Sequence, residues 1–354
     1  MSMDVTTGNK TENKPEANKM LTVSASPHAK NPRTVRGIML DVIIALIPAA
    51  FAGVTVFGAR AALVMATCVA ACVLFEYLAR RVMKRHNTVG DLTAVITGLL
   101  LAFNLPVQTP IWICVIGAFV AIVVVKQFFG GVGQNFANPA ITARVVLLVS
   151  FASAMTGFTS PVVGGADAVS SATPLASLGT LYGAGTGGSV EALLAEGRLP
   201  TLTQMFLGVR PGCIGETCAL ALLLGAAYLL IRGVIRIAIP AAYLLTFAAV
   251  MLCVSGFDLP FVAYELLSGG LLLGAFFMAT DYTTSPVNAA GKVVFGIGCG
   301  ALTAVIRLYG SLPEGVSYSI LLMNVACPLI EKFTAPKYFG FIKTKKTKKA
   351  GDAA

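Results

Sequence analysis

The segment Gly98-Leu99-Leu100-Leu101-Ala102-Phe103 (GLLLAF) recurs later in the chain as GLLLGAF at residues 270–276. Both copies lie in short apolar segments, residues 91–105 and 265–280. Polar breakers end both segments, Asn104-Leu105-Pro106 in the first and Thr280-Asp281 in the second. Short, interrupted apolar segments at matching positions of two halves are typical of half-helices that line a central site in membrane proteins. A pair of short, tilted spans is the alternative interpretation.

Eight further apolar segments surround these two, at residues 38–57, 61–80, 110–127, 139–155, 216–232, 236–254, 290–309 and 316–333. Of the 354 residues, 56% are hydrophobic and only 12% are charged. Soluble proteins carry about 25% charged residues, and a membrane span needs about 20 apolar residues. The sequence therefore predicts an all-α polytopic membrane protein with about ten transmembrane helices.

Lysine and arginine are distributed unevenly between the two sides of these segments. If the N-terminus lies inside, 22 of the 26 basic residues face the cytoplasm, and only Arg60, Arg198, Arg210 and Arg307 face outward. Cytoplasmic loops of membrane proteins carry such an excess. We therefore expect both termini to be cytoplasmic, and the net charge of +10 is explained without a nucleic-acid partner.

The order of the segments divides the chain into five parts. These are a cytoplasmic N-terminal segment (1–36), a first five-helix membrane repeat (37–155), an extracytoplasmic loop (156–211), a second five-helix membrane repeat (212–333) and a basic cytoplasmic tail (334–354). Because five spans is an odd number, the second half starts on the opposite side of the membrane from the first. An inverted repeat is therefore expected.

The charged residues, cysteines and histidines of the chain indicate neither a proton pathway nor a metal site in the apolar segments. The charged residues lie at or near segment ends, so we expect no buried carboxylate or histidine relay for protons. Glu76 lies four residues before Arg80, the spacing of a helical ion pair. The eight cysteines form no CxxC pair, and His28 and His86 are the only histidines. No metal site made by this chain alone is therefore predicted.

Two stretches could present backbone N–H groups to a ligand. Residues 128–139, FFGGVGQNFANP, precede the fifth segment, and Asn138 followed by Pro139 is a strong helix start. Free amides there can face an anion or a cofactor, although a connecting turn explains the same residues. Gly215-Glu216-Thr217 opens the sixth segment, where an acidic side chain suits the helix dipole and capping is the simpler interpretation.

The predicted outer loop contains the most specific string, DAVSSATPL at residues 167–175. By residue type alone it is a small-residue turn, with Pro174 holding Thr173 extended. However, Asp-x-x-Ser-x-Ala-Thr resembles the acceptor sequence at which a flavin transferase attaches FMN to threonine through a phosphoester bond. That chemistry needs an accessible hydroxyl among small residues, and Thr173 would be the acceptor. Ser171 departs from the glycine that is usual in this acceptor sequence.

Several motifs together resemble one protein family. Besides the string ending at Thr173, they are Ser26-Pro27-His28, residues 129–140, residues 212–218 and Phe277-Met278-Ala279-Thr280-Asp281. In this order they resemble the RnfD subunit of the Rnf electron transport complex (the NqrB/RnfD family) and, more distantly, the NqrB subunit of the sodium-pumping NADH:quinone reductase. Cys218 replaces a usual serine. The resemblance implies a ten-span fold related to urea transporters, covalent FMN on Thr173 and a second, non-covalent riboflavin.

The resemblance also implies a function for the chain. It would be a membrane subunit that carries electrons through its flavins in an ion-translocating ferredoxin:NAD oxidoreductase complex of the bacterial inner membrane, with either Na⁺ or H⁺ as the ion. Partner subunits would hold iron–sulfur clusters and a second covalent flavin, and a flavin transferase would mature the chain. Asn104, Asn138 and Asp281 are the candidates for lining the riboflavin site. The alternatives are the NqrB subunit of the reductase, or a channel or permease without redox function.

Overall fold

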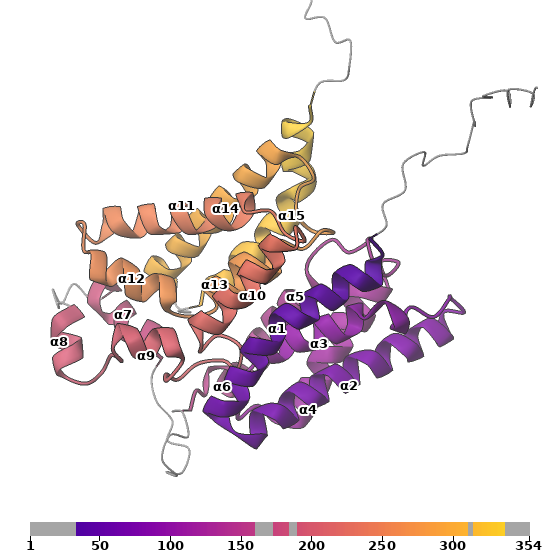
Figure 1. Ribbon diagram of the computed structural model, residues 1–354, viewed down its shortest axis with the longest axis horizontal. Coiled ribbons are helices and arrows are strands. Elements are labelled where there is room, and N and C mark those ends of the chain that lie inside the picture. Colours follow the sequence, from indigo (N-terminus) through magenta and orange to yellow (C-terminus); the bar gives the residue numbers. More distant parts are fainter. Residues whose placement is uncertain (1–32, 160–172, 184–189, 311–313, 337–354) are drawn as a thin grey trace, which may run out of the picture. The chain divides into compact units, whose positions relative to one another are not determined.

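The computed structural model describes residues 33–159, 173–183, 190–310 and 314–336, and all helices belong to a unit that begins at Val35. The described residues form helices and no strand. The first half contains α1 (Val35–Phe57), α2 (Ala59–Val82), the 3₁₀ turn η1 (Val89–Asp91), α3 (Thr93–Phe103), α4 (Ile111–Phe119) continuing as the π-helix η2 (Val120–Gln127), α5 (Pro139–Ser150) and α6 (Ala152–Thr156). The middle contains α7 (Pro174–Gly183), α8 (Val190–Ala195) and α9 (Leu202–Leu207). The second half contains α10 (Ala219–Ile231), α11 (Ala238–Val254), α12 (Leu259–Leu267), α13 (Leu271–Leu273) continuing as the π-helix η3 (Gly274–Met278), α14 (Ala289–Tyr309) and α15 (Val316–Thr334) (Figure 1).

Each of the ten apolar segments expected from the sequence is helical. Among the described residues, α1, α2, α14 and α15 are long and apolar enough to cross a membrane, and α12 with α13–η3 forms a bent pair that passes the same test together. The bend is 66° and falls at residues 268–270, which confirms that this segment is interrupted. The other five segments form shorter apolar helices. The prediction of an all-α polytopic membrane protein is confirmed.

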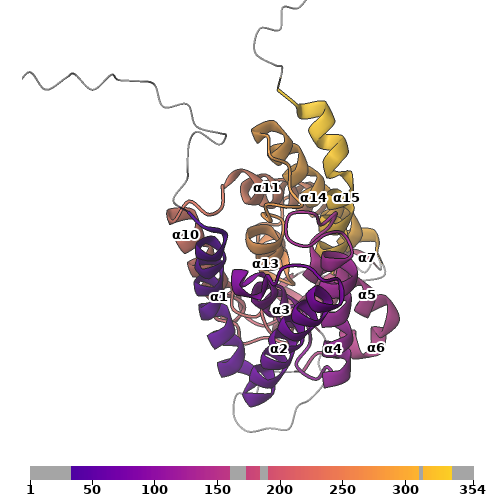
Figure 2. The same ribbon diagram turned by 90° about the vertical axis from the view of Figure 1, so that its right-hand side faces the viewer.

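The helices of the two halves pack in equivalent ways. Within the halves, α2 packs on α4 and α11 packs on α14, which pairs the second helix with the fourth in each case. Between the halves, α1 packs on α10 and α5 packs on α15 (Figure 2). The first helices of the two halves are therefore in contact, and so are the fifth helices. These contacts support the inverted repeat, which remains a prediction together with the likeness to urea transporters.

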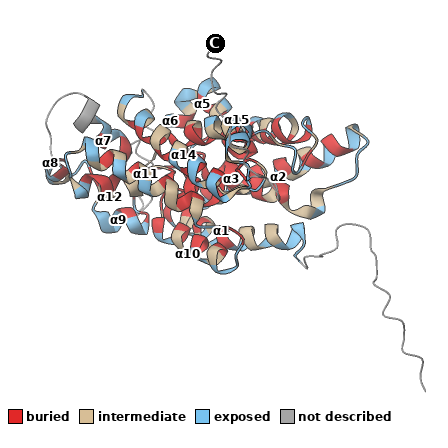
Figure 3. Cartoon of the chain, turned by 90° about the horizontal axis from the view of Figure 1, so that it is seen from above, coloured by how far each residue is buried: buried red, intermediate tan, exposed pale blue. Residues whose placement is uncertain are grey.

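A close backbone approach joins α1 to α10. A Cβ atom added at Gly225 would clash with the carbonyl oxygen of Ala45. Small residues allow such approaches between membrane helices, where van der Waals packing drives association. Buried residues gather where the helices meet (Figure 3), whereas large apolar side chains such as Phe51, Val149 and Leu245 are exposed. Such outward apolar side chains are expected of helices surrounded by lipid.

Ionisable residues differ from the expectation, because several are buried between helices. Glu76 is 0% exposed and pairs with Lys126 of η2 at 2.5 Å, so the predicted helical pair with Arg80 was wrong. Glu265 of α12 pairs with Arg307 of α14 at 2.8 Å. Both cations lie near the end of the fourth helix of their half. A position near a segment end therefore did not indicate that these two carboxylates are buried.

The three short helices α7, α8 and α9 were not expected, because residues 156–211 read as a loop. The α9 helix begins with a capping box, in which Thr201 accepts from the Gln204 N–H and the Gln204 side chain accepts from the Thr201 N–H. This Thr-x-x-Gln spacing is a local signal that identifies such a helix start.

Candidate functional site

A cavity with a volume of about 120 Å³ lies between α3 and η3. We call it the α3–η3 cavity. Apolar walls come from Leu100, Phe276 and Phe277, and polar atoms come from both halves of the chain. The polar lining residues are Thr93, Thr97, Lys126, Asn135, Asn138, Thr280, Asp281, Tyr282 and Thr283. Because one water needs about 10–15 Å³ of such space, the cavity is large enough for part of an organic ligand.

The sequence placed Asn138 at a helix start, and the structure confirms this role. Its Oδ1 accepts hydrogen bonds from the N–H groups of Ala140 and Ile141 at 3.1 and 3.4 Å. Pro139 occupies the first turn of α5, where its missing N–H is not needed. The Asn138 Nδ2 donates to the carbonyl oxygen of Met278, at 3.3 Å. The cap therefore also joins α5 to the end of η3, at the wall of the α3–η3 cavity.

Asp281 also lines the cavity and fixes the residues that follow it. Its carboxylate accepts hydrogen bonds from the hydroxyls of Thr283 and Thr284, at 2.9 and 3.3 Å. The side chain thereby fixes the turn that follows η3. The structure thus brings Asn138, from the glycine-rich stretch, and Asp281, from the end of the broken helix, to the lining of one cavity.

The third candidate, Asn104, lies outside the lining of the α3–η3 cavity. It is 2% exposed, and its Nδ2 donates to the sulfur of Met278 at 3.6 Å. Its Oδ1 accepts from Arg144 at 2.5 Å. Asn104 therefore joins the cavity wall at Met278 to a second polar cluster, and the expectation that it lines the same site as Asn138 is not met.

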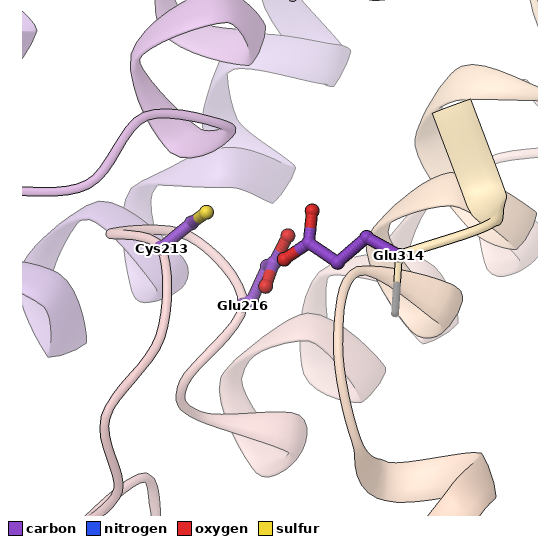
Figure 4. A group of neighbouring side chains, drawn as sticks. All are labelled: Cys213, Glu216 and Glu314. Carbon is purple, nitrogen blue, oxygen red and sulfur yellow. The ribbon is translucent and has the colours of Figure 1, made fainter. Parts of the chain in front are cut away.

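That second cluster surrounds Arg144 of α5. The side chains of Cys213, Glu216 and Glu314 converge on one region (Figure 4). Arg144 forms an ion pair with Glu216 at 3.2 Å and another with Glu314, and its second terminal nitrogen lies 3.6 Å from the Cys213 sulfur. The Arg144 guanidinium already pairs with both carboxylates, so the geometry fits an ion-pair network better than a cation site.

Glu216 does not play the capping role expected for it. The helix α10 begins at Ala219, and its first turn is capped by the Cys218 sulfur, which accepts from the Ala221 N–H at 3.4 Å. Glu216 instead lies before the helix, 3% exposed, against Arg144.

Thr173 lies at a second, smaller pocket of about 10 Å³, which we call the Thr173 pocket. Its lining residues are Thr173, Pro174, Leu175, Arg210, Pro211, Gly212, Glu216, Gly269 and Glu314. Thr173 is half-buried, and its Oγ1 accepts from the Ala176 N–H at 3.2 Å, at the start of α7. The preceding acceptor residues 167–172 lie outside the described part of the chain.

Polar contacts lead from one site to the other. Asn138 contacts Met278, Met278 contacts Asn104, and Asn104 contacts Arg144. Arg144 in turn contacts Glu216, which lines the Thr173 pocket. The α3–η3 cavity and the Thr173 pocket are therefore linked through the interior of the protein by contiguous residues from both halves, with the Met278 carbonyl oxygen as the partner of Asn138.

Sequence reasoning missed several residues at these sites. Lys126, Asn135, Arg144 and Arg210 line a site or connect the two sites. Asn135 has a buried Oδ1 without a hydrogen-bond partner in the described part of the chain; it belongs to the glycine-rich stretch that the sequence singles out, although not as an individual candidate. By its sequence position Arg144 is a charge near a segment end. Its position within α5 shows only in the structure.

The relatives found by comparison with known proteins are D subunits of oxidoreductase complexes, and the matching family model agrees with them. The model of the NQR2, RnfD, RnfE family matches residues 22–340. The chain is 49% identical to the D subunit of the Na⁺-translocating ferredoxin:NAD⁺ oxidoreductase complex of Acetobacterium woodii, over 93% of this chain and 98% of that protein. It is 42% identical to the D subunit of the proton-translocating ferredoxin:NAD⁺ oxidoreductase complex of Clostridium ljungdahlii, over 91% and 96%. It is 39% identical to the D subunit of the ion-translocating oxidoreductase complex of Stutzerimonas stutzeri, over 87% and 92%.

Proposed function

This chain belongs to the NQR2, RnfD, RnfE family, and from that premise we propose that it is the RnfD subunit of an ion-translocating ferredoxin:NAD⁺ oxidoreductase complex of the Rnf type. The observation that carries this proposal is the identity of 39–49% to proteins named as the D subunit of such complexes, over most of each chain. Their shared name favours this assignment over the NqrB subunit of the NADH:quinone reductase. A permease without redox function would not account for these relatives.

The first part of the proposed electron-carrier function is covalent FMN on Thr173. Three features support the assignment. Thr173 is half-buried and not enclosed, it lies at the N-terminus of the ten-residue helix α7, and Arg210 lines the same pocket. A phosphoester there would be stabilised by the helix dipole. The bound flavin would supply one- and two-electron chemistry, while the chain fixes its position.

The second part is a non-covalent riboflavin in the α3–η3 cavity. The apolar side chains Leu100, Phe276 and Phe277 suit the faces of an aromatic ring system. The buried Asn135 Oδ1 has no hydrogen-bond partner among the described residues, and an N–H donor on a ligand would satisfy it. Asn138 and Asp281 also line the cavity, whereas Asn104 is no longer a candidate for direct contact.

We place the chain in the bacterial inner membrane with both termini cytoplasmic, which makes the Thr173 pocket extracytoplasmic. In cells, a membrane-impermeant maleimide should label an Arg198→Cys variant from outside and an Arg81→Cys variant only after permeabilisation. Both native side chains are exposed, and the background from the exposed Cys253 is removed by a Cys253→Ala substitution in both variants. The reverse labelling pattern would overturn the orientation.

The proposed partners of this chain are other subunits of the Rnf-type complex, including those that hold iron–sulfur clusters and a second covalent flavin. A flavin transferase would act on Thr173 during maturation.

The covalent flavin has a direct test. The chain is produced together with a flavin transferase, separated on a denaturing gel and illuminated. A fluorescent wild-type band that is lost in Thr173→Ala supports the proposal. Thr201→Ala is the matched control, because Thr201 caps α9 in the same part of the chain and should leave the fluorescence unchanged. A dark wild-type band would refute covalent attachment, and a fluorescent Thr173→Ala band would refute the attachment site.

The riboflavin site needs a separate measurement. Folded chain is denatured, and released flavin is quantified relative to protein. Asn135→Ala should lower the riboflavin content, because the substitution removes the Oδ1 that we propose a ligand N–H satisfies. Asn87→Ala, an exposed asparagine, should leave the content unchanged. Equal riboflavin in both variants would exclude Asn135 from the site.

A further inference from the structure

Arg210 is a buried cation beside Thr173 whose hydrogen bonds go to neutral atoms. It is 3% exposed. Its guanidinium donates to the carbonyl oxygens of Glu216 and Thr217, at 2.5 and 3.1 Å, and to the Met205 sulfur at 3.8 Å. A guanidinium has five N–H groups. Two of them therefore have no acceptor within the described part of the chain.

No carboxylate among the described residues forms an ion pair with Arg210. Glu216 and Glu314, which line the same pocket, are paired with Arg144 instead. A buried charge is unfavourable unless it is paired. Burial lowers the pKa of Arg210 to about 10, although the nearby Glu216 carboxylate acts to raise it. The side chain therefore occupies a position where an additional anion would be stabilising.

The Thr173 pocket determines which anion can reach Arg210. Its volume of about 10 Å³ is close to that of a single water, so it can admit oxygen atoms but not a ring system. Thr173 lines it directly, with its Oγ1 at the start of α7. A phosphorus atom bonded to that oxygen would carry its two non-bridging oxygens at the mouth of the pocket, and its second ester oxygen would lead to the flavin.

We propose that Arg210 holds the phosphodiester of the flavin on Thr173, with its two free N–H groups donating to the two non-bridging oxygens. This inference rests on the proposed covalent FMN. A phosphodiester carries one negative charge and two such oxygens, which matches the planar fork of a guanidinium. Arg210 is thus a positioning residue. It fixes the linker at one point, so that the attached ring system occupies a limited region outside the pocket.

The test measures how firmly the flavin is held, independently of electron transfer. Chain produced with a flavin transferase is purified in detergent, and time-resolved fluorescence anisotropy gives the ratio of restrained to freely turning flavin. Loss of charge-assisted hydrogen bonds in Arg210→Gln should lower this ratio about tenfold or more. Arg210→Lys keeps the charge without the fork and should fall between that variant and the wild type. The matched control is Arg198→Gln, because Arg198 is 54% exposed and its ion pair is with the exposed Glu196.

The outcomes separate this inference from the proposed function. A wild-type chain without covalent flavin overturns both. A flavinylated Arg210→Gln chain with the wild-type anisotropy overturns the role of Arg210 and leaves the covalent flavin in place. If Arg210→Gln does not accumulate, Arg210→Lys decides: a wild-type ratio overturns the inference, and a lowered ratio supports it. A similar loss in Arg198→Gln would also overturn it.

Discussion

Replacing Lys126 with methionine tests whether the buried pair with Glu76 stabilises the fold. The Lys126 Nζ lies 2.5 Å from Glu76 Oε2 and 2.8 Å from Thr93 Oγ1, and both charged side chains are at most 2% exposed. Methionine fills a similar volume but leaves the Glu76 charge with only the Thr88 hydroxyl, at 2.6 Å, among the described residues. Breaking a buried pair in this way costs about 3–5 kcal/mol, or roughly 100- to 4,000-fold in the folding equilibrium.

Thermal unfolding in detergent provides the assay, with a fall in Tm of at least about 5 °C expected for Lys126→Met. The control is Lys292→Met, because Lys292 is half-buried and forms no ion pair among the described residues. The double variant Glu76→Gln with Lys126→Met removes both charges and should recover most of the loss, because no unpaired charge stays buried. If Lys126→Met and Lys292→Met unfold at the same temperature, the reasoning about this pair is wrong.

Three further substitutions have defined expectations. Gly225→Ala should destabilise the α1–α10 contact by about 1–3 kcal/mol, because its Cβ would clash with the Ala45 carbonyl; Gly90→Ala, which has open space around it, should be neutral in the same thermal unfolding assay. Asn138→Ala should cost about 1–2 kcal/mol through the lost cap, whereas Asn138→Ser keeps a capping oxygen and should lose less than half of that by thermal unfolding. Arg232→Gln should change the stability by less than about 1 kcal/mol, since Arg232 is 56% exposed where it pairs with Asp41, and a larger loss in Tm would show that this pair is not a weak surface contact.

Local signals in the sequence predicted where the helices lie. They did not predict the contacts between segments that are distant in the sequence. Apolar runs located all ten helical segments, because each run must bury its backbone polar groups in a helix to lie in lipid. The cap at Asn138 also followed from adjacent residues. By contrast, the spacing of Glu76 and Arg80 suggested a pair within one helix, whereas the crossing of α2 with η2 supplied Lys126, 50 residues away. Spacing along one helix carries no information about such a crossing.

The candidate sites show the same division. Asn138 was a candidate because it starts a helix after the glycine-rich stretch, and Asp281 because it follows a helix break; both line the α3–η3 cavity. Asn104 does follow a helix break, but its side chain donates to the Met278 sulfur and accepts from Arg144, and it does not line the cavity. Residue type and break position do not reveal which buried partners a side chain contacts. Arg210 was missed because only the fold brings it to the same pocket as Thr173.

The pairing of Arg144 has a consequence for synthesis of the chain. Its two carboxylate partners follow it by 72 residues at Glu216 and by 170 residues at Glu314. When the ribosome has completed α5, this arginine therefore has neither partner, and an arginine at the centre of an inserting helix is unfavourable by about 2.5–3.5 kcal/mol. Release of α5 from the translocon into lipid should accordingly wait for the C-terminal half. The last helix to emerge would then complete the insertion of the fifth.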